Sequence, residues 1–373
     1  MAWMLIVPAL IYAGLIFYFF AGLFRLRRDL RKNLFSVSVL VPARNEKFHI
    51  RDCLQSLWNQ TYPRDLFEVW IIDDESTDST AEIVRDYIKD KPNFHLISHH
   101  RDSSRPSFKK QALKFALEKV TGEIVMTIDA DSVAQPRWIE KMTGLYEEDT
   151  GLVAGVVTFF PEKEKTLFGK LQTLEFAGIV FCGVGAAGNH NPLICNGSNL
   201  SYRLKAFQDA GGYQGHEFLP SGDDDLLLQN IEKKTSWKIK YSVLRETVNY
   251  TRPVEDWFDF LNQRSRWASK SLYYPKKWLL LLMAIIYFYY LLIIVLFPVT
   301  LLGYFPWKIY LIAVMLKIIP ELFLIFRALQ FLGRLALLKY FFHGQVFQLI
   351  YVIIAGVRGF FHRFSWKEDG DAH

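Results

Sequence analysis

Two long stretches without a charged residue constrain this chain more than any other feature of its sequence. Residues 1–24 and 279–305 contain no Asp, Glu, Lys or Arg. A helix needs about 20 apolar residues to cross a bilayer, and both stretches are long enough. We therefore expect an N-terminal transmembrane anchor over residues 1–24 and a C-terminal membrane region over residues 279–361.

The charges beside these stretches indicate their orientation. Basic residues follow the first stretch and precede the second: Arg25, Arg27, Arg28, Arg31, Lys32, Lys276 and Lys277. Loops rich in Lys and Arg stay in the cytoplasm. A signal peptide would carry its positive charge before a shorter apolar core, so we expect an uncleaved anchor with its N-terminus outside. The expected location is the cell (inner or plasma) membrane, multi-pass, with the polar middle region in the cytoplasm.

The number of C-terminal spans stays open at this point. Two further apolar stretches, residues 309–329 and 340–357, have the minimum spanning length. Three spans after a cytoplasmic domain would leave Arg358 outside, against the positive-inside bias. We therefore expect two or three spans, or a last helix that lies in the membrane interface. Lys317 and Glu321 are spaced i,i+4, so they can neutralise each other on one helix face.

Composition excludes some partners of the middle region. The net charge of +6 does not predict nucleic-acid binding, because no basic stripe crosses this region. Cys53, Cys182 and Cys195 lack metal-ligand spacing, and their odd number argues against a disulfide framework. We expect reduced thiols without a metal.

The middle region alternates short apolar runs with segments of helical spacing. This alternation predicts an α/β domain with a mostly parallel sheet in two or three layers. Ligands of such a sheet bind beyond the carboxyl ends of its strands. Ser79 and Glu82 predict a capping box at one helix start. We expect strands over residues 36–41, 67–72, 94–98 and 124–128, and helices over residues 48–58, 79–88 and 111–119.

Two acidic pairs follow two of these strands. Asp73 and Asp74 end the second strand, and Asp129 and Asp131 follow the fourth. Mg²⁺ and Mn²⁺ are bound by a few carboxylates together with diphosphate oxygens. Alternate residues of an extended chain point to opposite sides, so we expect one of Asp129 and Asp131 to bind the metal directly. Acidic residues are also common in turns, and neither pair is specific by itself.

A third acidic group, Gly222-Asp223-Asp224-Asp225, precedes an apolar helix. These carboxylates could cap the positive end of that helix. Alternatively, one of them, crowded by like charges, could accept a proton in catalysis. The motif alone leaves both interpretations open.

The last motif combines an amide, a cation and an indole. Gln263, Arg266 and Trp267 stand at i, i+3 and i+4 and therefore share one face of a helix. That face could bind a diphosphate and stack on a sugar. Basic and aromatic residues close to a membrane also belong to the interface belt, which is the alternative interpretation.

Taken in this order, the motifs resemble those of the membrane-bound family 2 inverting glycosyltransferases, whose relatives include cellulose, chitin and hyaluronan synthases. The resemblance covers about residues 35–271 and implies a cytoplasmic nucleotide-sugar-binding domain of the GT-A type over residues 33–271, flanked by transmembrane helices. It rests on Pro42-Ala43-Arg44-Asn45-Glu46, Asp73-Asp74-Glu75-Ser76-Thr77-Asp78, Lys110-Gln111-Ala112-Leu113, Asp129-Ala130-Asp131, Gly222-Asp223-Asp224 and Gln263-Arg264-Ser265-Arg266-Trp267.

The resemblance implies a donor site on the sheet. Uracil and ribose would be contacted by Pro42, Glu46, Asp73 and Asp74, whereas Lys110 would lie near the diphosphate. The family usually has Gly after the acidic pair, where this chain has Glu75.

The metal and the base follow from the same resemblance. Asp129 and Asp131 would hold the nucleotide and a Mg²⁺ or Mn²⁺ ion, with Asp131 the stronger metal-ligand candidate. The general base of the family's Thr-Glu-Asp motif falls on Asp224. Because this chain has Gly-Asp-Asp instead, a shift of one residue would make Asp223 the base.

The acceptor side would be formed by Gln263, Arg266 and Trp267, which bind the diphosphate and form the floor of the acceptor site in this family. Residues 196–199 and Gly211-Gly212 resemble its small-residue wall around the donor sugar, and they are also ordinary turn signals. Residues 167–184 are apolar at near-helical spacing, so we expect a helix that lies either in the membrane interface or in the protein core.

The expected function is transfer of a sugar, with inversion, from a nucleotide-sugar (UDP-linked) to a growing polysaccharide. Transfer of a single sugar to a lipid acceptor is the alternative within the enzyme class, and an inactive scaffold or a transporter are alternatives outside it. The expected partners are the donor, a glycan or lipid acceptor, membrane lipids and a homo-oligomer or export partner, without nucleic acid.

Overall fold

The computed structural model describes residues 2–26, 30–102, 107–219 and 221–361. The chain divides into two compact units. The sheet unit comprises Arg25–Phe160 and His190–Arg252, and the helical unit comprises Met1–Phe24, Pro161–Asn189 and Pro253–His373. Two segments within the expected domain of residues 33–271 therefore belong to the helical unit, and the domain boundaries stay a prediction.

The sheet unit is built on a seven-stranded sheet in the order β3-β2-β1-β4-β7-β5-β8. β7 is antiparallel to both of its neighbours, and the other pairs are parallel. A second sheet pairs β6 with β9 in parallel. This confirms the mostly parallel α/β prediction. The strands are β1 (Val37–Ala43), β2 (Phe67–Asp73), β3 (Phe94–Ser98), β4 (Ile124–Thr127), β5 (Thr150–Ala154), β6 (Val157–Phe159), β7 (Leu200–Arg203), β8 (Lys238–Tyr241) and β9 (Asn249–Thr251).

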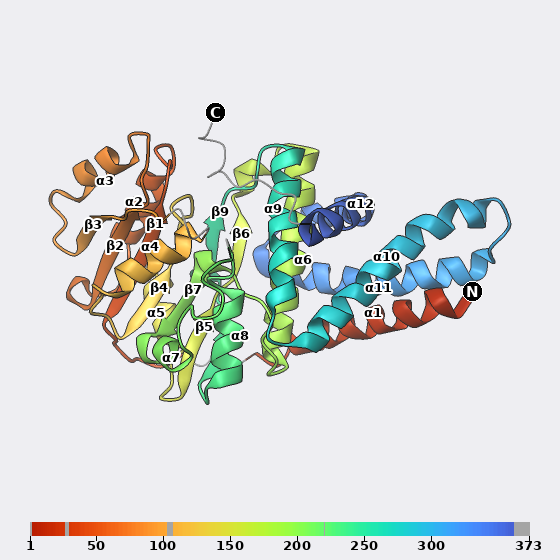
Figure 1. Cartoon of the computed structure of the whole chain (residues 1–373), viewed down its shortest axis with the longest axis horizontal. Helices are drawn as coiled ribbons and strands as arrows, with labels where there is room; N and C mark the ends of the chain where they lie inside the picture. Colours follow the sequence, from red (N-terminus) through yellow and green to blue (C-terminus); the bar gives the residue numbers. More distant parts are fainter. Residues whose placement is uncertain (1, 27–29, 103–106, 220, 362–373) are drawn as a thin grey trace. The chain divides into compact units, whose positions relative to one another are not determined.

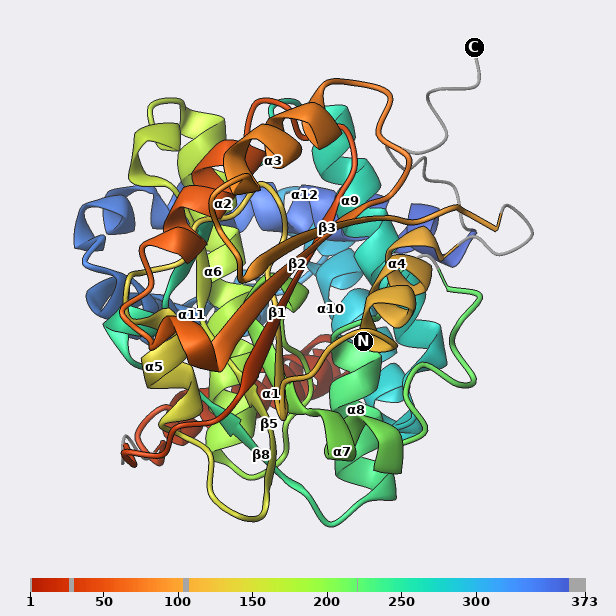
Figure 2. The same cartoon turned by 90° about the vertical axis from the view of Figure 1, so that its left-hand side faces the viewer.

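Helices cover both faces of the large sheet, which gives three layers (Figure 2). One face carries α2 (Ile50–Trp58), α3 (Thr80–Ile88) and α5 (Trp138–Thr143), and the other carries α4 (Phe108–Leu117), α7 (Leu204–Asp209) and α8 (Asp225–Lys234). β1 lies between β2 and β4 in the sheet. The chain adds β2 and β3 on one side of β1 and β4 on the other, so the strand order reverses beside β1. Such a position, where the strand order reverses, is where an open α/β sheet binds its ligand.

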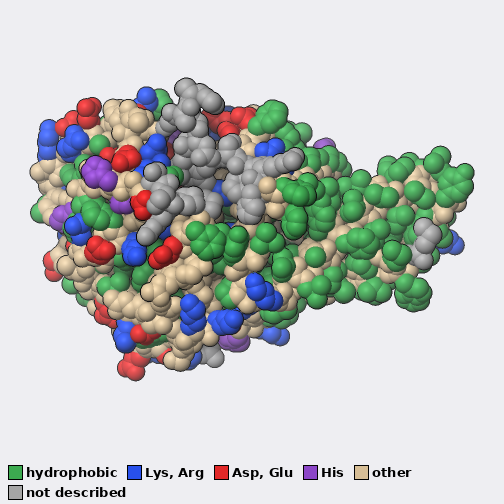
Figure 3. Space-filling view, viewed as in Figure 1, with side chains coloured by type: hydrophobic (Ala, Val, Ile, Leu, Met, Phe, Trp, Pro, Cys, Tyr) green, Lys and Arg blue, Asp and Glu red, His purple; other side chains and the backbone are tan. Residues whose placement is uncertain are grey.

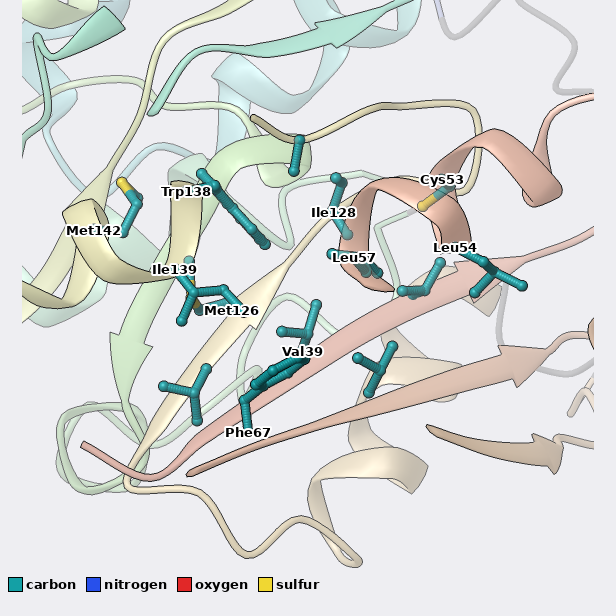
Figure 4. Packing of buried hydrophobic residues seen from close by; sticks show 14 of the residues in the cluster. Val39, Cys53, Leu54, Leu57, Phe67, Met126, Ile128, Trp138, Ile139 and Met142 are labelled. Atoms are coloured by element: carbon teal, nitrogen blue, oxygen red, sulfur yellow. The ribbon is translucent and has the colours of Figure 1, made fainter. Parts of the chain in front are cut away.

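The main core lies between the sheet and the α2–α5 face (Figure 4). Val39 and Met126 point from the strands toward Leu57 of α2 and Ile139 of α5, and all four are fully buried. Trp138 is also fully buried, and its indole N–H donates to Asn199 Oδ1 at 2.8 Å. Alternate residues of β1 and β4 face this layer of helices. Most of the residues between them are buried as well, because helices also cover the other face of the sheet.

The elements expected from the sequence are present, with one local error. The first four strands and the three helices lie within three residues of their expected bounds. The capping box at α3 is wrong, because the Ser79 side chain makes no capping hydrogen bond. Asp78 Oδ1 instead accepts from Thr80 N at 2.9 Å, so the carboxylate one residue earlier stabilises the helix start.

The helical unit contains α1 (Ala2–Gly22), α6 (Leu167–Gly188), α9 (Trp257–Lys270), α10 (Lys277–Leu301), α11 (Trp307–Leu332) and α12 (Phe341–Phe360). α1, α10 and α11 run side by side, whereas α6 and α9 cross their direction (Figure 1). Five helical segments of the described residues, α1, α6, α10, α11 and Leu335–Phe360, are long and apolar enough to cross a membrane. Exposed apolar side chains such as Leu281 and Leu311 cover α10 and α11 (Figure 3).

A buried polar cluster connects α1, α11 and α12 within this unit. Lys317 Nζ donates to Glu321 at 2.9 Å, to Gln345 at 2.5 Å and to Gln348 at 2.7 Å. Tyr12 of α1 donates its hydroxyl to Glu321. All three ammonium protons therefore have acceptors, which confirms the expected Lys317–Glu321 pair.

α1 and α6 cross with their backbones in contact. A Cβ atom on Gly22 would overlap the carbonyl oxygen of Gly185, and one on Gly188 would overlap that of Gly22. The crossing therefore requires glycine at these positions.

Candidate active site

A lysine between two carboxylates marks the carboxyl edge of the large sheet. Asp129 follows β4, and its Oδ1 lies 2.7 Å from Lys109 Nζ. The same ammonium lies 3.1 Å from Asp223 Oδ2. Burial acts to lower the pKa of Lys109, but Asp129 and Asp223 outweigh it and raise this pKa well above its ordinary value. Lys109 is therefore a permanent positive charge at this edge.

Asp224 caps a helix, which is one of the two roles that the sequence left open, and proton acceptance stays a prediction. It is the N-cap of α8, where its Oδ1 accepts from Asp225 N at 2.7 Å. Its Oδ2 accepts from Gly197 N at 3.2 Å. Two backbone N–H groups thus orient this carboxylate, while Asp225 is buried and accepts from Cys195 N at 2.9 Å. Capping and a place in the acidic cluster are compatible for Asp224, and Asp225 is structural.

Gly197 lets the backbone approach this cluster closely. A Cβ atom here would lie 2.9 Å from Asp223 Oδ2 and 3.4 Å from Lys109 Nζ. Two residues on, Asn199 Nδ2 donates to the carbonyl oxygens of Val156 and Thr247. Asn199 therefore stabilises the fold through these hydrogen bonds, whereas Gly197 lies next to the acidic cluster.

The donor set at Asp129 and Asp131 fits a cation shared with a phosphate. Asp131 Oδ1 accepts from Ser132 Oγ at 3.1 Å and from Thr251 Oγ1 at 3.4 Å. Among the described residues, no group of three or more acidic, His or Cys side chains could hold a metal ion. Mg²⁺ bound to nucleotides needs only one or two protein carboxylates, because phosphate oxygens and water complete its shell. Asp129 and Asp131 satisfy that requirement.

The carboxylates after β2 are buried and engaged. Asp74 accepts from His99 Nδ1 at 2.9 Å and from Arg101 Nη2 at 2.6 Å. Asp73 is also buried, and its Oδ1 accepts from Ser76 N at 3.4 Å. Both carboxylates are thus fixed in place at the end of the strand.

The loops around this edge have an unusual backbone. Glu75 has φ +57°, a left-handed conformation that glycine adopts more readily than other residues. On the β1 side, Pro42 pairs in register with Ile72, and Glu46 N donates to Thr80 Oγ1 at 2.8 Å. Pro42 thus lies on β1 and Glu46 on the loop that follows it, and their contact with uracil and ribose stays a prediction.

The Lys110 side chain is held by backbone carbonyl groups, and its expected place near the diphosphate stays a prediction. Its Nζ donates to the carbonyl oxygens of His216 at 2.6 Å and Leu219 at 3.0 Å, and the side chain is buried. Lys110 thereby fastens the loop that leads to Asp223. The lysine among the carboxylates is Lys109, which could not be found from the sequence because the rotation of α4 about its axis was unknown.

The Gln-Arg-Trp motif lies on α9 in the helical unit. Gln263, Arg266 and Trp267 are half-buried, whereas the intervening Arg264 and Ser265 are buried. This burial pattern agrees with the shared face expected from i, i+3, i+4 spacing. The structure thus brings Asp129 and Asp223 together at Lys109 in the sheet unit and describes the motif residues within the helical unit.

This fold and this cluster define a class: an α/β enzyme with carboxylates and a lysine at the ligand-binding edge of its sheet. Residues 38–210 match the model of the family Glycosyl transferase family 2. The chain is therefore similar to the family 2 glycosyltransferases over these residues, which make up somewhat less than half of its length.

Curated relatives agree with this assignment. The chain is 26% identical over 263 residues to the probable glycosyltransferase YdaM of Bacillus subtilis, covering 68% of this chain and 59% of that protein. It is 26% identical over 250 residues (65% and 50%) to beta-monoglucosyldiacylglycerol synthase of Nostoc sp.. It is 28% identical over 236 residues (61% and 52%) to poly-beta-1,6-N-acetyl-D-glucosamine synthase of Staphylococcus epidermidis. The matched region thus spans between half and three fifths of the length of these relatives.

A solved structure shares the fold. The mannosyltransferase PcManGT from Pyrobaculum calidifontis, in complex with GDP-Man and Mn²⁺, superposes with a TM-score of 0.60 at 18% identity. The alignment covers 97% of this chain and 99% of that one. At this identity the likeness shows the fold alone.

Proposed function

We propose that the protein transfers a sugar from a UDP-linked donor, with inversion at the anomeric carbon, to a growing polysaccharide at the cytoplasmic face of the membrane. The observation that carries this proposal is the cluster of Lys109, Asp129, Asp223 and Asp224. It offers a fixed cation, two carboxylates paired with it and one carboxylate oriented by backbone N–H groups.

The donor side is assigned to the edge formed by β1, β2 and β4. Pro42, Glu46, Asp73 and Asp74 are proposed to contact uracil and ribose, and Lys109 the diphosphate.

Asp131 and Asp129 are the proposed ligands of Mg²⁺ or Mn²⁺, whose chemistry when bound is to neutralise the charge of the leaving diphosphate. The PcManGT structure contains Mn²⁺ together with its nucleotide-sugar, which supports the use of a divalent cation. Lys109 adds a positive charge that needs no reorganisation during the reaction.

The acceptor side needs a base, and Asp224 fits this role better than Asp223. Asp223 is paired with the Lys109 ammonium at 3.1 Å, which engages its charge. Asp224 is held by N–H groups of the backbone, and a carboxylate oriented in this way can accept the proton of an acceptor hydroxyl. We assign proton removal from the acceptor to Asp224. Gln263, Arg266 and Trp267 are proposed to bind the diphosphate and to form the floor of the acceptor site.

The directions of the helices support three membrane spans. α1, α10 and α11 run side by side, and Arg327 of α11 packs against Phe24 just after α1, with its guanidinium carbon 4.9 Å from the ring centroid. α1 and α11 thus end on the same side. With α6 and α12 in the interface, Arg334 and Arg358 stay in the cytoplasm, as the positive-inside bias requires. This arrangement removes the conflict that three C-terminal spans would create.

The Gln-x-x-Arg-Trp pattern supports polysaccharide assembly, and we propose a homo-oligomer or an export partner because three spans form no pore by themselves. Transfer of one sugar to a lipid is the second candidate, supported by the similarity to a glucosyldiacylglycerol synthase.

The test is nucleotide release by detergent-purified protein with a panel of UDP- and GDP-sugars, with Mg²⁺, Mn²⁺ or EDTA, and with membrane lipids as acceptor. We expect release with one donor, abolished by EDTA, and a product whose size separates polymer from glycolipid. Asp224→Asn should lower turnover by about 10²–10⁴-fold, the usual contribution of a general base, with UDP binding nearly unchanged. Near wild-type turnover of this variant would move the base to another residue, and no release with any donor would favour the inactive scaffold.

A further inference from the structure

Arg264 is the most deeply buried charged residue of α9, the helix that carries Gln263, Arg266 and Trp267. Its guanidinium forms a two-pronged ion pair with Glu175 of α6: Nε lies 2.8 Å from Oε1, and Nη2 lies 2.5 Å from Oε2. Both side chains are only 3% exposed. Arg264 lies between Gln263 and Arg266 in the sequence, and the proposed reaction assigns it no role.

Glu175 is held in turn by a third helix. Tyr351 of α12 donates its hydroxyl to Glu175 Oε1 at 2.8 Å. The carboxylate is therefore fixed from α9 and α12 at once, and α6, α9 and α12 meet at this one group.

The guanidinium also contacts two of the three motif side chains. Arg264 Nη1 donates to Gln263 Oε1. Its central carbon lies 4.2 Å from the ring centroid of Trp267 and 4.5 Å from that of Phe260. Arg264 thus holds the Gln263 amide through a hydrogen bond and the Trp267 ring through a cation–π contact.

The energetics favour orientation over stability as the reason for this pair. A buried ion pair gives little net stability compared with apolar residues of the same volume, because both charges lose water. A guanidinium bound at two points has a fixed plane. With its plane set by Glu175, Arg264 allows one rotation of α9 and one position of the Trp267 ring.

We propose that Glu175 and Arg264 are positioning residues for sugar transfer: they set the Trp267 ring and the Gln263 amide in the geometry that receives the acceptor and the diphosphate. The proposal rests on the proposed function, since it assigns a task to the motif residues. Its consequence is that a residue on α6, far from the motif in sequence, controls turnover.

The kinetic test uses Glu175→Gln, which keeps the shape and removes the charge, and Arg264→Lys, which keeps the charge and removes the fork. We expect kcat to fall about tenfold to a hundredfold, the usual cost of a misplaced site, with the KM of the nucleotide-sugar nearly unchanged. The matched control is Glu164→Gln, which removes a carboxylate paired with Arg334 in the same unit and should leave kcat unchanged.

A second readout does not depend on activity. Hydrogen–deuterium exchange of the peptide over residues 257–270 should become about tenfold faster or more in Glu175→Gln, as expected for a helix that loses its buried anchor, and should not change in Glu164→Gln. If wild-type protein transferred no sugar from any donor, the proposed function would fail, while the exchange result would still decide on the coupling of Glu175 to α9.

Two results would overturn the proposal. One is a folded Glu175→Gln protein with kcat and exchange over residues 257–270 both within twofold of wild type. The other is faster exchange across the whole helical unit, which would indicate a purely structural pair. If Glu175→Gln did not fold, Tyr351→Phe would serve, because it removes one hydroxyl from Glu175; we expect kcat to fall about threefold, a loss in the range of one hydrogen bond, and an unchanged kcat would likewise overturn the proposal.

Discussion

Each of the two units contains a lysine that is paired with side-chain oxygen atoms. The two lysines differ in how far they and their partners are exposed to solvent. Lys109 in the sheet unit is 24% exposed, and its partners Asp129 and Asp223 are 37% and 12% exposed. Lys317 in the helical unit is 2% exposed, and three protein oxygens accept its protons. The acceptors of Lys109 thus reach solvent, as the proposed binding site requires, whereas Lys317 is enclosed in a structural connection.

The largest expected effect tests the structural half of this comparison. Lys317→Met leaves Glu321 buried without its cation, and breaking a buried pair costs about 3–5 kcal/mol. We expect a lower unfolding temperature in detergent. Lys317→Met combined with Glu321→Gln should recover most of the loss because it removes both charges. If the single variant were as stable as wild type, the comparison would fail on this side.

Lys109→Met tests the other half. It should lower kcat/KM for the nucleotide-sugar by about 10²–10³-fold, as expected for a preorganised charge in an active site, with an unfolding temperature close to that of wild type. Steady-state nucleotide release measures the first and thermal unfolding the second. A fall in stability without a fall in kcat/KM would show that Lys109, like Lys317, has a structural role only.

His216, on the loop of the sheet unit that Lys110 binds, makes the stability of the protein depend on pH. Burial, followed by the charge of Lys110, lowers the pKa of His216 from 6.5 to about 4. A lowered folded-state pKa means that the stabilisation is present above the unfolded pKa and is lost as pH falls from about 6.5 toward 4, by up to about 3 kcal/mol. His216→Asn should flatten this part of the stability profile in urea titrations at successive pH values. An unchanged slope would show that other groups cause the acid sensitivity.

The smallest expected effect concerns the backbone of the acidic cluster. A Cβ atom on Gly197 would lie 2.9 Å from Asp223 Oδ2, so Gly197→Ala must displace a carboxylate of the site. We expect kcat to fall about tenfold, since displacement of a catalytic group by a fraction of an ångström is costly. Gly14→Ala, whose added Cβ meets no atom within 4 Å, is the control and should have wild-type kcat.

Much of this fold could be predicted because its signals are local. The β-branched runs and the acidic pairs after β2 and β4 give strands and their carboxyl ends, and i, i+3, i+4 spacing gives the shared face of Gln263, Arg266 and Trp267. Lys109 could not be distinguished from Lys110, because one residue of helix rotation separates the cluster from the loop. The Arg264–Glu175 pair joins helices far apart in sequence, and no local pattern indicates such a contact.

The glycine crossing of α1 and α6 has a practical consequence for anyone who wants the enzyme free of detergent. Deleting the first helix to obtain a water-soluble enzyme would strip Gly185 and Gly188 of the helix that they touch and expose an apolar strip of α6. A foreign hydrophobic leader with ordinary side chains could not take its place, because only a residue without a Cβ fits at position 22. The N-terminal helix is therefore an integral part of the helical unit rather than a segment that another apolar helix could replace.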